Sequence, residues 1–311
     1  MSLLPITLFK LRRIIGLALF ALVLTGCSML RLAYDQAPNL VYWTIDGYVD
    51  VSGEQTPRLR DAIDRWFAWH RRTQLPEYAE LLARAQREIN EPMTPAAVCA
   101  WQGVVERRVD LALQEAVPAA AELMLTLSPE QLQHIERRMA KGNDETRADF
   151  VQADPAERRA KSLARSVERF EMLYGRLDAA QRERLATLLA ASAFDPERWL
   201  AERRARQRDA LQALTLVSMA ARTDPGAASR QAAAAARQII EQSARSPRTD
   251  YRAYQQRLTQ DNCALVATMH NAMTPAQRLA ARAKLKSWEG DVRLLIAASP
   301  RVDDGIGAAS R

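Results

Sequence analysis

Three histidines and three cysteines are the side chains best suited to metal or covalent chemistry in this 311-residue chain. His70, His134 and His270 stand far apart, and none belongs to a His-x-x-x-His or Glu-x-x-His pattern that would place two ligands on one helix face. The chain also lacks a Gly-x-Ser-x-Gly elbow, a P-loop and a Gly-x-Gly-x-x-Gly turn. We therefore expect no catalytic residues, no metal site and no cofactor, and we do not expect an enzyme.

The remaining chemistry concerns Cys27, which ends a segment typical of exported bacterial proteins. Lys10, Arg12 and Arg13 precede an uncharged apolar run over residues 14–24. A membrane-spanning helix needs roughly 20 such residues, about twice the length of this run. The pattern therefore predicts a signal peptide over residues 1–26.

The apolar run ends in Leu24-Thr25-Gly26-Cys27, followed by Ser28. This box resembles the lipobox of bacterial lipoproteins. The resemblance implies cleavage between Gly26 and Cys27, a thioether lipid on Cys27 and a fatty acyl chain, such as palmitate, on the new amino terminus. Ser28, in place of Asp, implies sorting to the periplasmic face of the outer membrane rather than retention in the inner membrane. The alternative is an ordinary cleaved signal peptide with Cys27 close to the cut.

Cleavage before Cys27 would change the net charge of the chain and place the other two cysteines in the periplasm. The whole chain carries 44 basic and 37 acidic side chains, a formal charge of +7. Without the three basic residues of 1–26 the charge is +4, which together with a periplasmic location argues against nucleic-acid binding. Cys99 and Cys263 would lie in an oxidising compartment, and we expect a disulfide between them. Two buried free thiols are the alternative.

Repeated helix-start signals indicate how these residues are positioned. Seven expected helix starts have a Ser, Thr or Asp directly before a proline, which suits an N-cap followed by the first helical position: Thr56, Thr94, Ser128, Asp154, Asp195, Asp224 and Thr274. Apolar residues at three- and four-residue spacing follow each start, and alternating β-branched runs are nearly absent. The fold class is therefore all-α, a multi-helix bundle or helical-hairpin array of about ten helices with short loops.

The expected organisation is one helical domain over residues 38–298, after a tether at 27–37 and before a disordered tail at 299–311. Pro118 should kink or end one helix. The expected helices are 38–50, 56–72, 75–90, 95–125, 129–150, 155–176, 179–193, 196–221, 225–245, 250–272 and 275–297.

Three of the helix starts share an apolar-cap-x-x-Gln pattern: Leu127-Ser128-Pro129-Glu130-Gln131, Leu177-Asp178-Ala179-Ala180-Gln181 and Met273-Thr274-Pro275-Ala276-Gln277. Cap and glutamine can form a capping box, and the leading apolar residue can form a hydrophobic staple. These pentapeptides also resemble the LTxxQ motif of the Spy-type periplasmic chaperones. That resemblance implies an all-α protein of the same compartment.

Aromatic residues gather in the first part of the mature chain. Tyr34 and Pro38 lead to Trp43, Asp46 and Tyr48, and further on come Trp69-His70 and Leu75-Pro76-Glu77-Tyr78. This order resembles a family of uncharacterised Gram-negative lipoproteins defined by a domain of unknown function. The resemblance covers nearly the whole mature chain and implies no activity.

The same aromatic residues have two interpretations. They can close one end of the bundle as core, because Trp and Tyr bury large areas. Alternatively Tyr42, Trp43, Trp66 and Trp69 form a partner surface beside the membrane.

The functional hypothesis is a lipid-anchored, periplasm-facing helical protein that binds another envelope protein in envelope maintenance or biogenesis. A periplasmic chaperone or stress sensor is the alternative, and a hydrolase of envelope polymers is a third class.

Overall fold

The computed structural model describes residues 29–298, and within them the chain is all-α, as predicted. Eleven helices follow one another with short connections: α2 (Met29–Val49), α3 (Gln55–Glu88), α4 (Pro95–Glu115), α5 (Val117–Leu125), α6 (Pro129–Phe150), α7 (Pro155–Tyr174), α8 (Ala179–Ala191), α9 (Pro196–Thr223), α10 (Pro225–Ala244), α11 (Thr249–Asn271) and α12 (Pro275–Ala297). The predicted tail at 299–311 lies outside the described residues.

Six of the seven predicted caps are confirmed. Thr94, Ser128, Asp154, Asp195, Asp224 and Thr274 are N-caps whose side chains accept backbone N–H groups, and each is followed by the proline. The prediction for Thr56 is wrong, because α3 already begins at Gln55. The Thr56 hydroxyl instead donates to the Ser52 carbonyl at 3.0 Å.

Two predicted helix boundaries near prolines are wrong, because both prolines lie inside a helix. The expected helices 56–72 and 75–90 are one 34-residue helix, α3, with Pro76 inside it. Its neighbours Leu75 and Ala79 are each only 3% exposed, so packing holds the helix together through the proline. Pro38 likewise lies inside α2, and the segment expected as a tether is helical from Met29 onward. The break expected at Pro118 is confirmed, since α4 ends at Glu115 and α5 begins at Val117.

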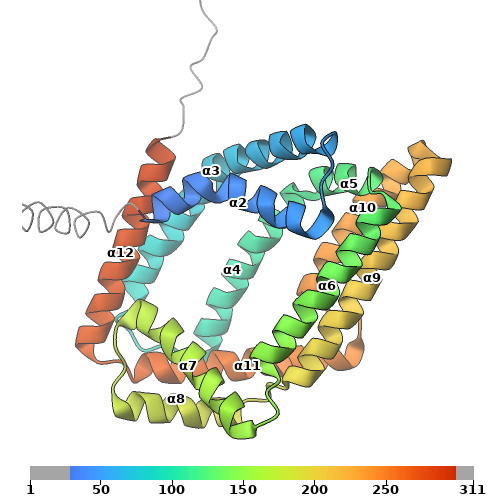
Figure 1. Cartoon of the computed structure of the whole chain (residues 1–311). Helices are drawn as coiled ribbons and strands as arrows, with labels where there is room; N and C mark the ends of the chain where they lie inside the picture. Colours follow the sequence, from blue (N-terminus) through green and yellow to red (C-terminus); the bar gives the residue numbers. More distant parts are fainter. Residues whose placement is uncertain (1–28, 299–311) are drawn as a thin grey trace, which may run out of the picture.

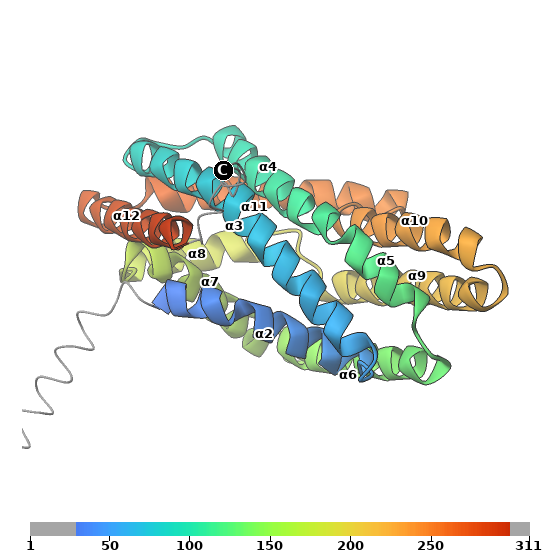
Figure 2. The ribbon, with the colours of Figure 1, turned by 90° about the horizontal axis from the view of Figure 1, so that it is seen from above.

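The helices form an open frame (Figure 1). α3 packs along α12 on one side, and α9 packs along α10 on the other, where α5 and α6 join them. α7, α8 and α11 form the lower edge in this view. Seen from above, α2, α6 and α7 lie on one face of the frame, and α4 lies on the opposite face (Figure 2).

The apolar core is divided among four clusters. One joins α7, α8, α11 and α12 around Leu177, Leu185 and Met269. A second joins α5, α9 and α10 around Val217, and many of its members are alanines, which let the helices approach closely. Two smaller clusters both include α3: the one around Leu75 joins it to α12, and the one around Tyr42 joins it to α2. Because no single core joins all the helices, the contacts between clusters decide the shape of the frame.

One of these contacts is covalent. The structure joins Cys99 in α4 to Cys263 in α11 as a disulfide, with 5.5 Å between the two Cα atoms and 164 residues between them in sequence. Cys263 is 1% exposed. The bond fixes one end of α4, a helix that contains no buried residue.

We predict that Cys99→Ser combined with Cys263→Ser lowers the free energy of unfolding by about 5 kcal/mol, the value that chain entropy assigns to so long a loop. Denaturant unfolding of the mature protein measures this loss. Thiol counting under non-reducing, unfolding conditions is the independent check. Two reactive thiols in the wild-type protein would contradict the disulfide.

Candidate functional site

Capping boxes form at all three predicted helix starts. Gln131, Gln181 and Gln277 each accept the backbone N–H of their own N-cap residue, while the N-cap side chain accepts theirs in return. The apolar residues that lead the three boxes are buried, with Leu127, Leu177 and Met273 each no more than 5% exposed. Each pentapeptide therefore begins a helix and also anchors the preceding turn to the apolar core through its first residue.

A fourth box escaped the sequence analysis. The Ser52 N–H donates to the Gln55 Oε1 atom at 2.9 Å, and the Gln55 N–H donates to the Ser52 Oγ atom at 3.3 Å. Val51-Ser52-Gly53-Glu54-Gln55 has the same apolar-cap-x-x-Gln pattern as the other three. This pattern is present in the sequence, but the Thr56-Pro57 pair directly after it predicts a different helix start.

The boxes of Gln55 and Gln131 meet through their glutamines. The Gln55 Nε2 atom donates to the Gln131 Oε1 atom at 3.2 Å, and the Gln131 Nε2 atom donates to the Gln55 Oε1 atom at 2.8 Å. Each amide also donates to a carbonyl of the opposite turn: Gln55 to Thr126 at 3.0 Å, and Gln131 to Asp50 at 2.8 Å. This junction joins the α2–α3 turn to the α5–α6 turn.

The boxes of Gln181 and Gln277 meet in the same way. The Gln181 Nε2 atom donates to the Gln277 Oε1 atom at 2.7 Å, and the reverse bond measures 2.9 Å. Gln181 further donates to the Ala272 carbonyl at 3.0 Å, and Gln277 to the Arg176 carbonyl at 2.9 Å. This junction joins the α7–α8 turn to the α11–α12 turn.

The two junctions follow one rule. In all four cases the glutamine donates to its partner glutamine and to the carbonyl of the residue that directly precedes the partner's apolar residue. Each Oε1 atom accepts two N–H groups and each Nε2 atom donates twice, so every amide uses its full hydrogen-bonding capacity. The junctions lie at opposite corners of the frame (Figure 1). The chain thus repeats one device, a pair of helical turns locked by two glutamines.

The N-terminal aromatic residues form a packed layer between α2, α3 and α4. The Tyr34 hydroxyl lies 2.9 Å from the His70 Nδ1 atom, and the Trp66 ring stacks on His70 with 4.8 Å between ring centroids. The Trp66 indole N–H donates to the Ala112 carbonyl at 2.9 Å. Burial lowers the pKa of His70 and raises the pKa of Tyr34. These contacts are structural, and they fix the second end of α4.

The four residues predicted as a partner surface do not share one environment. Tyr42 is 7% exposed and belongs to a core cluster with Leu59 and Ile63, so it does not line a surface. Trp66 and Trp69 are half-buried. Trp43 is 61% exposed, and it alone of the four stands free on the surface. The structure therefore favours the core interpretation for most of the aromatic residues.

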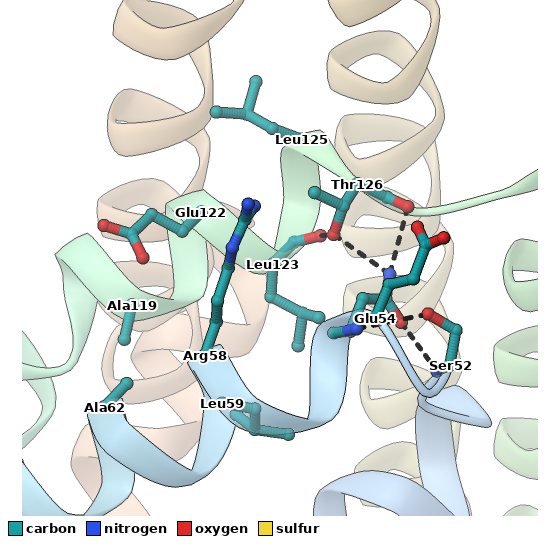
Figure 3. Close-up of a pocket in the computed structure, with 11 residues that line it drawn as sticks. Ser52, Glu54, Arg58, Leu59, Ala62, Ala119, Glu122, Leu123, Leu125 and Thr126 are labelled. Atoms are coloured by element: carbon teal, nitrogen blue, oxygen red, sulfur yellow. Dashed lines mark hydrogen bonds between the residues drawn. The ribbon is translucent and has the colours of Figure 1, made fainter.

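The cavity beside the first junction has a volume of about 540 Å³. Arg58 lies between Glu122 of α5 on one side and Glu54 on the other (Figure 3). Gln55 and Thr126 also line the cavity. Both glutamates are exposed to solvent. The general acid of a polymer hydrolase is a carboxyl group shielded from water, so this pair does not strengthen the hydrolase hypothesis.

The three histidines stay apart. His70 belongs to the aromatic layer, the His134 Nε2 atom lies 3.3 Å from the Gly47 carbonyl, and His270 lies under the second junction. Within residues 29–298, no three His, Cys, Asp or Glu side chains gather closely enough to hold a metal ion.

His270 is 1% exposed and hydrogen-bonded at both ring nitrogens. Its Nε2 atom lies 2.8 Å from the Glu91 carbonyl, and its Nδ1 atom lies 2.8 Å from the Tyr174 hydroxyl. A carbonyl can only accept, so Nε2 carries the proton and Nδ1 accepts from tyrosine. Burial lowers the pKa of His270 and raises the pKa of Tyr174 to about 12. This contact joins α7 to α11 in the uncharged form of the imidazole.

The predicted lipidation and sorting residues, Gly26, Cys27 and Ser28, lie outside the described residues. Among the helices that the structure does describe, none combines the length and the apolar character needed to cross a membrane.

Residues 47–231 match one family model, described as "Family of unknown function (DUF6279)". The predicted resemblance to a family defined by a domain of unknown function is therefore confirmed, over a shorter stretch than the nearly whole mature chain that we expected. No curated protein and no solved structure matches the chain.

We predict that Gln181→Leu lowers the free energy of unfolding by about 1–3 kcal/mol, because it removes the donor to the Ala272 carbonyl and both hydrogen bonds to the Gln277 amide. Gln277→Leu should cost a similar amount. The double variant should cost clearly less than the two single variants together, because both halves of the pair are then gone. Urea unfolding measures the four members of this cycle.

The matched control is Gln133→Leu, which changes an exposed glutamine on α6. It should change stability by no more than about 0.5 kcal/mol. Additive costs in the double variant, or an equal cost for Gln133→Leu, would show that the junction does not act as a unit.

We also predict that the protein loses stability as the pH falls below about 6.5, the ordinary pKa of histidine. The unfolded chain then binds protons that buried His270 and His70 resist, so acid favours unfolding. Melting temperatures at pH 7.5 and 5.5 measure the effect. His270→Gln should flatten this dependence, whereas His134→Gln should leave it intact. An unchanged slope in His270→Gln would contradict the neutral, buried imidazole.

Proposed function

The chain belongs to DUF6279, a family of unknown function, and we propose from its own sequence and geometry that it is a lipid-anchored, periplasm-facing protein that binds another envelope protein. The acyl chains on Cys27 hold it at the outer membrane. Its role lies in maintaining or building the cell envelope. The Leu24-Thr25-Gly26-Cys27 box supports the anchor, and the distribution of exposed apolar side chains supports binding.

That distribution is uneven. Sixteen large apolar residues of the described chain are exposed, and nine of them lie on α2 and α4 alone. Single exposed apolar side chains are normal, whereas groups of them mark sites of interaction. The concentration on two of eleven helices is the observation that carries the proposal.

α4 is the helix best suited to receive a protein partner. Val105, Val109 and Leu113 are 54%, 52% and 40% exposed and follow one another at four-residue spacing, so they share one face. The Cys99–Cys263 bond fixes one end of α4 and the Trp66–Ala112 hydrogen bond fixes the other. A rigid helix with an apolar row at this spacing can pack against a helix of a second protein with little loss of conformational freedom.

A periplasmic chaperone is the second candidate, and the paired glutamine boxes favour it. Four apolar-cap-x-x-Gln boxes lock two pairs of turns, and three of these boxes resemble the LTxxQ motif of the Spy-type chaperones. Exposed apolar rows on a frame held at its corners suit transient contact with unfolded clients. The two candidates differ in the number of proteins that they bind.

We predict that a photo-crosslinking residue in place of Val109 captures one defined envelope protein in intact cells. Val105→Ser in the same chain should lower the yield, because it removes a neighbour in the apolar row. A crosslinking residue in place of Leu216 on α9, which is also 49% exposed, is the matched control. Mass spectrometry identifies the products.

Many unrelated products at Val109, together with suppression of client aggregation by the purified protein, would favour the chaperone. The same products at Val109 and Leu216 would contradict specific binding through α4.

A further inference from the structure

We propose that the outer face of α2 lies in the headgroup region of a phospholipid membrane, so that a helix of the folded domain contacts the bilayer beside the acyl chains. This inference rests on the proposed anchor at Cys27. Beyond the anchor, it gives the domain an orientation on the membrane, with α2 against the lipid and α4 turned away from it.

The outer face of α2 is apolar and uncharged. Leu32, Leu40 and Trp43 are 58%, 61% and 61% exposed. At 100° per residue they lie within about 80° of one another around the helix axis. The exposed positions between and beside them include Gln36 and Thr44, which carry no charge. A continuous uncharged strip therefore follows most of the helix.

None of the three charged residues of α2 lies within this strip. At the same 100° per residue, Asp46 and Asp35 fall about 40° and about 60° beyond its Leu32 edge, and Arg31 about 100° beyond it. Asp35 pairs with Arg71 of α3 at 3.4 Å, and the Asp46 Oδ1 atom accepts the Val51 N–H at 3.0 Å. Both carboxylates beside the strip thus have partners within the protein.

Packing of its inner face prevents α2 from rotating about its own axis. Tyr42 and Ile45 pack into the cluster around Leu59, and Tyr34 packs against the cluster around Leu75. Tyr34 is also bonded to His70. Since these contacts fix the rotation of α2 about its axis, Leu32, Leu40 and Trp43 stay on the surface of the folded chain.

Three features favour lipid over a protein partner for this strip. Tryptophan with aliphatic neighbours is typical of the membrane–water interface. Arginines border α2 on both sides: Arg60 lies over the Tyr42 ring at 3.8 Å and Arg138 over the Tyr48 ring at 5.4 Å. α7, on the same face of the frame (Figure 2), carries five basic and three acidic residues. Such a border suits anionic phospholipid headgroups.

The place of α2 in the chain is the third feature. The helix begins at Met29, two residues after the cysteine that the lipobox marks for acylation. Two residues span at most about 7 Å. A lipid anchor at Cys27 therefore holds the first turn of α2 close to the bilayer surface, where the strip that begins at Leu32 can reach it.

Tryptophan quenching by brominated acyl chains tests this contact. The full chain, purified from the membrane fraction of expressing cells, is reconstituted into vesicles of phosphatidylethanolamine and phosphatidylglycerol with and without bromine. We expect quenching in the wild-type protein and its loss in Trp43→Phe. Trp199→Phe, which changes a half-buried tryptophan on α9, should keep the quenching.

A second pair of variants leaves every tryptophan in place. Leu32→Gln with Leu40→Gln should also remove the quenching, because it makes the strip polar. Leu216→Gln with Met219→Gln, an equal change on exposed α9 residues, should not. Far-ultraviolet circular dichroism shows that each variant is folded.

Mass spectrometry of the Cys27 peptide separates the inference from the anchor. Acylated Cys27 without quenching of Trp43 overturns the membrane contact and leaves the anchor standing. Trp43 quenching with unmodified Cys27 supports the contact and overturns the anchor. Unmodified Cys27 with no quenching overturns both.

Discussion

The frame depends on one interaction, a glutamine amide that caps its own helix and at the same time binds the opposite turn. Such an amide can be buried without penalty because two donors and two acceptors surround it. Gln181 is only 4% exposed, yet its side chain meets the Asp178 N–H, the Gln277 amide and the Ala272 carbonyl. Once this geometry is set, the entry angles of four helices are set with it, and the other junction repeats the arrangement at the opposite corner.

An open frame with four separate apolar clusters needs such fixed corners. The helices between them are long and partly exposed, and α4 contributes no buried residue at all. The disulfide, the aromatic layer and buried Glu202, which accepts from Ser246 and Arg248, secure the remaining connections. A few polar and covalent contacts thus fix how the apolar clusters are arranged. Apolar side chains on α2 and α4 stay exposed in this arrangement, and these are the surfaces that we propose for lipid and for a protein partner.

Local chemistry was readable from the sequence, and long-range pairing was not. The capping side chains before proline and the period of the apolar residues predicted most helices to within a few residues, because both depend on neighbours in the chain. Pro76 misled the prediction because buried Leu75 and Ala79 keep α3 continuous, a tertiary effect that no local pattern records. Three boxes were recognised one by one. Their pairing could not be, since Gln181 and Gln277 are 96 residues apart and a pattern of five residues names no partner.

Four glutamines lock four turns of the frame, and hydrogen exchange at these turns tests the lock most directly. The N–H groups of Ser52, Ser128, Asp178 and Thr274 each donate to a glutamine Oε1 atom at 2.9–3.0 Å. Amide exchange followed by NMR should show these four N–H groups protected as strongly as the helix interiors, because releasing them requires a junction to open. Exchange as fast as that of Gly53, a turn residue outside the hydrogen-bonded pairs, would contradict the account.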